Sequence, residues 1–404
     1  MTKRRVVITG MGAVSPFGVG VAPLWQGLRE GRSAIAPLRH PESARVRMKV
    51  AAQLPEGIDL TPLLNEAMLP LLDRVSQFAL VASDEAVHQS GLDVRAHGDR
   101  IGAIIGTGVG GVITHDEQSK RIYVEKGERA HPLTIVRTMV NAPASQVSMA
   151  HGLRGPVFAV SSACASANHA IAQALATIRS GAVDVMLTGG TEACLTYGLI
   201  KAWDAMRVVA DDTCRPFSAN RRGLVLGEGA AVFVLEEMEH AKARGATILA
   251  ELAGAGMSAD AGDIVAPSAD GAALSITRAL QDAELEAGDI DYINAHGTGT
   301  MANDATETKA IRLALGAHAQ SIPVSSTKSM HGHALGAAGA LELAAMIAAL
   351  DDQFVPPTAN YEQADPACDL DIVPNVGRPA KIRAAISNSF AFGGLNAVLA
   401  VRQA

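Results

Sequence analysis

The sequence predicts an α/β protein made of two similar halves, and three observations support this. Short apolar, β-branched runs alternate with stretches of helical periodicity, which is typical of layered proteins with a mainly parallel sheet. The 404 residues are 48% hydrophobic and include 39 glycines, so large cores can form in which helices and strands approach closely. One strand-and-turn pattern occurs twice in the chain. We therefore expect an N-terminal half at residues 1–249 and a C-terminal half at residues 250–404.

Hydrophobic periodicity places the elements of the N-terminal half. An apolar run at residues 6–8 predicts a first strand that enters a glycine turn. This beginning also resembles a dinucleotide-binding turn, but Ser15 occupies the place of the third glycine and no acidic residue follows at the expected distance. The other expected elements are a helix at 76–91, strands at 101–105, 156–160, 183–187 and 230–235, and a helix at 167–178.

Two turns of the first half have counterparts in the second half. The stretch Val160-Ser161-Ser162-Ala163-Cys164 aligns with Val324-Ser325-Ser326-Thr327-Lys328. The turn Gly106-Thr107-Gly108 aligns with Gly297-Thr298-Gly299. Each copy follows an apolar strand, and the two patterns come in the same order in both halves, which favours an internal duplication.

Cys164 stands where an expected strand meets an expected helix. At the beginning of a helix the first N–H groups lack partners and the macrodipole is positive, which lowers the pKa of a thiol. Cys164 is therefore a candidate nucleophile. A cysteine among alanines is also a common small core residue, so this assignment depends on its neighbours.

Polar residues follow expected strands of the second half as well. His296 lies in one such turn, and Lys328, His331 and His333 lie in the next. Because the carboxyl ends of parallel strands line one crevice, we expect these residues to share a site with Cys164. A metal site of His331, His333 and Cys164 is an alternative. We favour catalysis without a bound metal, because no carboxylate or further cysteine stands near to complete the ligand set.

Composition argues against several other classes of protein. A net charge of −7 and 3% aromatic residues give no basis for nucleic-acid binding. The four cysteines, at 164, 194, 214 and 368, are too sparse for a disulfide scaffold, which favours the reducing cytoplasm. No apolar run approaches the roughly 18 residues that a membrane-spanning helix needs.

Six motifs carry a resemblance to a known family. They are Ser162-Ala163-Cys164, Asn294-Ala295-His296-Gly297-Thr298-Gly299-Thr300, Ser326-Thr327-Lys328-Ser329, Gly332-His333, Gly336-Ala337-Ala338-Gly339 and Asn388-Ser389-Phe390-Ala391-Phe392-Gly393-Gly394. With them the chain resembles the β-ketoacyl-acyl carrier protein synthases of the elongation type (synthase II), over essentially its whole length. The resemblance implies the thiolase fold, with two duplicated halves in a five-layered αβαβα arrangement, and a homodimer.

The resemblance also implies an acyltransferase that performs a decarboxylative Claisen condensation without a cofactor. Cys164 would hold the acyl group, with the backbone N–H groups of Cys164 and Phe392 as its oxyanion hole. His296 and His333 would bind malonyl-acyl carrier protein and stabilise the enolate that decarboxylation leaves. Lys328 would support His333. The product would be a 3-oxoacyl-acyl carrier protein two carbons longer, in fatty-acid or specialised acyl-chain synthesis.

Further positions match substrate-binding residues of the family, although each could also be ordinary packing. These are Val109 at the acyl tunnel, Trp203 on the malonyl side, Thr298 and Thr300 at the phosphopantetheine arm, and Phe390 and Phe392 as gates. Glu342 matches a position near a monovalent cation in some relatives. Its alternative is an exposed place on its helix.

The chain departs from the elongation pattern at several positions. They are Asp263 and Val265 in place of histidine and threonine, Ala391 in place of glycine, His331 in place of threonine, and Pro70-Leu71-Leu72 in place of a more basic carrier-docking segment. A histidine two residues before His333, and the segments at 201–207 and 212–219, resemble the nodulation-type ketosynthases. We therefore expect a specialised enzyme with a narrower substrate range.

Rival assignments remain open within and beside this family. Initiation enzymes pair the cysteine with one histidine and an asparagine, and thiolases use a second cysteine. Here His333 occupies the position that distinguishes these enzymes from the elongation type. A polyketide-type ketosynthase would use the same residues on other acyl chains. A non-catalytic chain-length partner subunit of a heterodimer would have lost Cys164.

Overall fold

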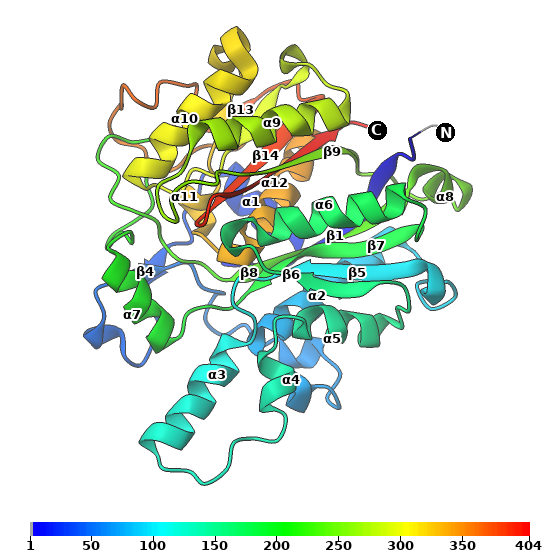
Figure 1. Cartoon of the computed structure of the whole chain (residues 1–404), viewed down its shortest axis with the longest axis vertical. Helices are drawn as coiled ribbons and strands as arrows, with labels where there is room; N and C mark the ends of the chain where they lie inside the picture. Colours follow the sequence, from blue (N-terminus) through cyan, green and yellow to red (C-terminus); the bar gives the residue numbers. More distant parts are fainter. Residues whose placement is uncertain (1–2) are drawn as a thin grey trace.

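One mixed sheet of eleven strands runs through the molecule, whose computed structural model describes residues 3–404 (Figure 1). The strand order is β11-β10-β14-β15-β9-β1-β8-β7-β5-β6, and β2 pairs with β1 outside this path. The strands are β1 Val6–Ser15, β2 Gly18–Val19, β5 Ile101–Gly106, β6 Val157–Val160, β7 Val185–Glu192, β8 Gly229–Glu237, β9 Ala250–Ala259, β10 Tyr292–Asn294, β11 Val324–Ser325, β14 Ala384–Ala391 and β15 Leu395–Arg402.

The sheet consists of two halves with the same pattern of pairing. From either outer edge, two parallel pairs are followed by two antiparallel pairs, in β6-β5-β7-β8-β1 and again in β11-β10-β14-β15-β9. The halves join through a short antiparallel ladder between β1 and β9. This repeated topology agrees with the duplication predicted from the matching turns. The division between residues 249 and 250 itself stays a prediction.

The expectation of a mainly parallel sheet is wrong. All pairs between β7 and β14 along the strand order are antiparallel. One cause is visible at the C-terminus, where the turn Phe392–Gly394 reverses the chain between β14 and β15. So short a connection can join only antiparallel neighbours, because a parallel pair needs a crossover of a dozen or more residues.

Helices cover both faces of the sheet and fill the space between its halves. The helices α2 (Arg74–Ser90) and α5 (Ala142–His151) pack on the outer side of the first half. On the outer side of the second half, α9 (Ala269–Ala283) packs on the sheet and α10 (Met301–Leu315) packs on α9. Between the halves lie α6 (Ser166–Arg179) and α12 (Ala338–Asp352), each in contact with strands of both (Figure 1). These are the five αβαβα layers that the resemblance implied.

The central helix α12 is buried on all sides, which decides the position of one candidate residue. Residues 338–350 are all buried and consist mainly of alanine and leucine, as a helix between two sheets requires. Glu342 lies within this run and has no exposed surface. The alternative that placed Glu342 on an exposed helix face is therefore wrong.

Other expected elements are present, with shifted ends. The first strand extends to Ser15. The strand expected at 183 begins at Val185, because Asp184 receives side-chain hydrogen bonds from Arg4 and Arg100 at the entrance. Within residues 3–404, no helix combines the length and the apolar character needed to cross a membrane.

Candidate active site

Cys164 lies on a tight turn between β6 and α6. The strand ends at Val160, a short 3₁₀ turn η6 spans Ala163–Ala165, and α6 begins at Ser166. Ala163 has a φ of 51°, a left-handed conformation that costs energy for a residue with a Cβ and is typical of functional sites. The Ser166 hydroxyl donates to the Ala163 carbonyl and accepts from the Ser162 N–H, which holds the turn. The strand-to-helix position predicted for Cys164 is thus confirmed.

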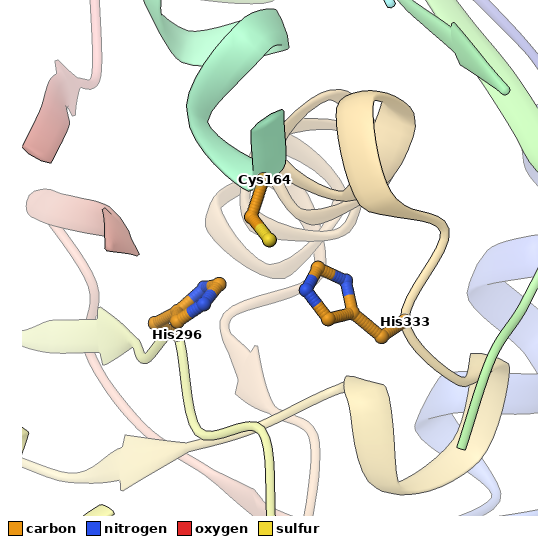
Figure 2. A group of neighbouring side chains, drawn as sticks. All are labelled: Cys164, His296 and His333. Atoms are coloured by element: carbon orange, nitrogen blue, oxygen red, sulfur yellow. The ribbon is translucent and has the colours of Figure 1, made fainter. Parts of the chain in front are cut away.

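Three predicted residues meet at one point although they come from three separate turns. Reactive atoms of Cys164, His296 and His333 lie within 4.8 Å of one another, and all three side chains are buried. The two imidazole rings are 5.4 Å apart and almost perpendicular. Figure 2 shows the thiol of Cys164 facing both rings. A nucleophile and two hydrogen-bonding groups therefore share one site.

His296 follows β10 and is held through its backbone. The carboxylate of Glu307, on α10, accepts hydrogen bonds from the N–H groups of His296 and Gly297 at 2.8 and 2.7 Å, and from the Asn388 side chain at 3.0 Å. The Nδ1 atom of the His296 ring has no partner within the described chain. Sequence reasoning missed Glu307, because an acid on a helix gives no sign of burial.

His333 is also fixed by its backbone while its ring remains free. Its N–H donates to the Val225 carbonyl at 2.7 Å, and its carbonyl accepts from the Gly227 N–H at 2.9 Å. Neither ring nitrogen has a hydrogen-bond partner among residues 3–404. Buried polar atoms without partners are costly, so both rings are disposed to bind a substrate atom.

A buried ion pair lies behind the histidines. Lys328 and Glu342 have no exposed surface and form a salt bridge. Burial lowers the pKa of His296 and His333 well below the usual value, and the positive charge of Lys328 lowers it further. Both rings are therefore neutral at physiological pH, and each carries one N–H. Burial also raises the pKa of Glu342 to about 7, against the opposing effect of Lys328.

The thiol pKa differs from the prediction. Burial raises the pKa of Cys164 to about 11, although Lys328 and the N–H groups of Phe392 and Cys164 act in the opposite direction. The lowered pKa expected from the helix start is wrong, because loss of water around the sulfur outweighs these dipoles. The N–H groups of Phe392 and Cys164 nevertheless face the sulfur, as an oxyanion hole for an acylated Cys164 would require.

A cavity of about 100 Å³ opens onto the three residues. Its wall includes four of the six predicted substrate-binding residues: Thr298, Thr300, Phe390 and Phe392. Val109 and Trp203 do not line it. They belong to the apolar cluster packed around Cys164, in which Trp203 lies 6.1 Å from Phe392 between ring centroids. On that side the site is closed by packing.

His331 takes no part in the cluster. Its Nε2 atom is hydrogen-bonded to the Thr327 hydroxyl at 3.0 Å, and burial lowers its pKa to about 3. The metal alternative built on His331 is therefore wrong in its ligand set. Within the described residues, His296 is the histidine that joins His333 and Cys164.

Three of the departures from the family pattern, Asp263, Val265 and Ala391, line the cavity. Val265 is 52% exposed there, and Asp263 accepts hydrogen bonds from the N–H groups of Val265 and Ala266. Ala391 is the last residue of β14 and has no positive φ, so its Cβ adds no backbone strain. The left-handed residues of this loop are Gly393 and Gly394, with φ of 85° and 68°. The restriction expected at position 391 therefore does not arise from backbone conformation.

Comparison with known proteins defines the class. Residues 3–241 match the family described as "Beta-ketoacyl synthase, N-terminal domain", and residues 249–362 match "Beta-ketoacyl synthase, C-terminal domain". The chain therefore belongs to the β-ketoacyl synthase family, whose members are acyltransferases.

Relatives and a solved structure place it more narrowly. Nodulation protein E of Rhizobium meliloti (strain 1021) is 51% identical over 401 residues, which is 99% of each chain. The 3-oxoacyl-acyl-carrier-protein synthase 2 of Synechocystis sp. is 40% identical over 414 residues, which is 100% of this chain and 99% of the relative. A type II polyketide ketosynthase, solved in complex with its acyl carrier protein, is 33% identical with a TM-score of 0.90 over the whole of both chains.

We predict that alkylation of Cys164 is slow at neutral pH and accelerates by about tenfold per pH unit, because only the thiolate reacts and the pKa is about 11. Cys164 lines the cavity, whereas Cys194 and Cys214 do not. Peptide mass mapping after iodoacetamide treatment at several pH values measures this rate. Equal labelling of Cys194 or Cys214, or a rate independent of pH, would contradict the prediction.

Proposed function

We propose that Cys164 takes an acyl group from an acyl carrier protein and condenses it with malonyl-acyl carrier protein, giving a 3-oxoacyl-acyl carrier protein two carbons longer. The observation that carries this proposal is the convergence of one thiol and two neutral imidazoles on the wall of one cavity. Its family, and its similarity to a 3-oxoacyl-acyl-carrier-protein synthase 2, support the same reaction.

In the first step the sulfur of Cys164 attacks the acyl thioester. The carbonyl oxygen becomes an oxyanion, which the N–H groups of Cys164 and Phe392 stabilise. The carrier thiol leaves, and the proton lost by Cys164 ends on it. Because the resting thiol is protonated, transfer of this proton has to accompany the attack.

In the second step malonyl thioester loses carbon dioxide, and the bonding electron pair passes into an enolate. Neutral His296 and His333 donate N–H groups to the enolate oxygen, a role that needs no protonated imidazole. The enolate carbon then attacks the acyl carbonyl on Cys164, a carbon–carbon bond forms, and the cysteine thiolate leaves and is protonated. Lys328 stabilises the charge that develops, and it adds to the effect of burial that keeps both rings neutral.

A monovalent cation near Glu342 stays a proposal. The second carboxylate oxygen of Glu342 has no partner within the described chain, as a cation ligand would require. Specialised substrate choice is also proposed. Its supports are the similarity to Nodulation protein E and the apolar Val265 on the wall of the cavity.

We predict that His296→Ala and His333→Ala still acquire an acyl group on Cys164 but decarboxylate malonyl thioester about 100- to 1000-fold more slowly, because each loses one oxyanion donor. Intact-protein mass spectrometry follows acylation, and release of carbon dioxide follows the second step. Cys164→Ala should abolish acylation, and His331→Thr should be mild. Full decarboxylation by His333→Ala would contradict these roles, and condensation that requires a second, different chain would favour a partner-subunit role.

A basic cavity beside Trp203 supports docking of the carrier protein. Arg47, Lys49, Arg207 and Arg222 line it and are exposed, and none forms an ion pair in the described part of the chain. Asp204 and Asp211 also line the cavity, so the lining is positive on balance. In a chain with a net charge of −7 this is a local concentration of positive charge, which attracts an acidic partner. It lies on a different segment from the uncharged Pro70-Leu71-Leu72.

Reversing one positive charge of the basic cavity should weaken recognition of the carrier protein and leave the chemical steps unchanged. We predict that Arg207→Glu raises the KM for acyl carrier substrates about fivefold, and more at low salt, with kcat unchanged. Small-thiol acyl and malonyl thioesters should react as with wild type. Lys242→Glu, on α8 (Met238–Ala243) at the opposite side of the molecule, is the control (Figure 1). An unchanged KM for the carrier would contradict the docking site.

We also propose that the protein is a cytoplasmic homodimer. The four cysteines are free, as in reducing compartments. The strand β6 is the outer edge of the sheet, and Phe158 on it is 39% exposed. An edge strand with an exposed aromatic residue is a typical surface for strand pairing with a second copy.

We predict that Phe158→Asp dissociates the dimer, because a carboxylate would lose its hydration in the interface. Sedimentation velocity would then report a monomer, while wild type sediments as a dimer. Val376→Asp, which alters an apolar residue that is 76% exposed elsewhere, should remain dimeric. A monomeric wild type would contradict the proposal.

A further inference from the structure

Glu192 is a fully buried carboxylate for which the condensation mechanism has no use. It ends β7 and has no exposed surface. One oxygen accepts hydrogen bonds from the Thr107 hydroxyl at 3.0 Å and the Val109 N–H at 3.3 Å. The other accepts from the N–H groups of Gly108 and Gly336 at 2.7 and 2.9 Å. Two segments far apart in the sequence thus share one carboxylate.

These two segments flank the reaction centre. Residues 107–109 form the turn after β5, and Val109 at its end packs in the cluster around Cys164. Gly336 belongs to η9 (Leu335–Ala337), which Ala334 separates from His333. A Cβ on Gly108 or Gly336 would come within 2.7 or 2.8 Å of a Glu192 oxygen, so both glycines are needed for the close approach. Glu192 therefore connects the wall beside the nucleophile to the histidine turn.

The charge of Glu192 has no counter-ion. No lysine, arginine or histidine among residues 3–404 forms an ion pair with it, and only neutral donors reach its oxygens. The titratable groups that face it are the thiols of Cys164 and Cys194. Burial raises the pKa of Glu192 to about 7, although all four donors oppose this shift. A buried charge without a counter-ion destabilises the fold, so a carboxylate at position 192 indicates a functional role for this residue.

We propose that Glu192 is a positioning residue whose carboxylate holds the Gly108–Val109 turn, which packs around Cys164, against the His333 turn, and so sets which acyl chains Cys164 accepts. The inference rests on the proposed function, since it concerns acylation of Cys164. Protonation turns one acceptor oxygen into an O–H donor that faces other donors. The hydrogen bonds that Glu192 makes to the two turns then weaken, and Cys164 accepts acyl chains that it otherwise excludes.

The test compares acylation of Cys164 by short, medium and long acyl-carrier thioesters, followed by intact-protein mass spectrometry between pH 6 and 8.5. In wild type, the ratio of kcat/KM for the preferred chain to that for the poorest chain should fall as the pH drops below about 7. Glu192→Gln resembles the protonated form, so its ratio should be lower by about fivefold and independent of pH. Thr107→Val removes one donor to Glu192 together with the acceptor of the Gly110 N–H, and it should give a smaller loss that still depends on pH.

The matched control is Glu251→Gln, which alters a buried glutamate on β9 that pairs with Arg5 and Arg402 instead. Its chain ratio and pH dependence should equal those of wild type. An unchanged ratio in Glu192→Gln, or an equal loss of rate for every chain, would overturn the inference. If Glu192→Gln does not fold, the wild-type pH profile and Thr107→Val decide the question. Failure of wild type to be acylated by any carrier thioester would overturn the proposed function instead.

Discussion

The buried charge of Lys328 is the constraint on which the site depends. Lys328 has no exposed surface, and its charge is tolerable there because Glu342 pairs with it from α12. Removal of one partner of a buried ion pair typically costs about 3–5 kcal/mol, because the other charge remains unpaired. The central helix layer is thus both the core of the fold and the electrostatic support of the reaction. The same charge adds to the burial that lowers the pKa of His296 and His333, and it opposes the burial that raises the Cys164 pKa.

Duplication explains why the reactive groups meet. The edge strands β6 and β11 occupy equivalent places in the two half-sheets, and Cys164 and Lys328 follow them. The two copies of one turn have therefore diverged to a nucleophile and a buried cation. Since α6 and α12 lie together between the half-sheets, Cys164 reaches the cavity while Lys328 is buried against Glu342 of α12.

Carboxylates hold the site from outside the reaction centre. Glu307 accepts hydrogen bonds from the N–H groups of His296 and Gly297. Glu192 accepts hydrogen bonds from the N–H groups of Gly108, Val109 and Gly336. In both cases a single side chain satisfies several backbone donors of a turn that has no strand or helix partner. The reacting side chains themselves make few hydrogen bonds, which leaves them available for substrate.

The sequence alone determined the elements and the reaction centre. Apolar periodicity located α2, β5, α6 and β8, and the repeated turns indicated the duplication. The motifs around Cys164, His296 and His333 indicated a condensing enzyme, because such motifs describe local backbone and chemistry that neighbouring residues specify. Only the tertiary structure decided the rest. Three features depend on contacts between distant segments. They are the antiparallel pairing of the central strands, the burial of Glu342, and the hydrogen bonds that Glu192 and Glu307 accept from turns. The Cys164 pKa follows for the same reason: a helix start is visible in sequence, but the removal of water that outweighs it is produced only when the layers close around the sulfur.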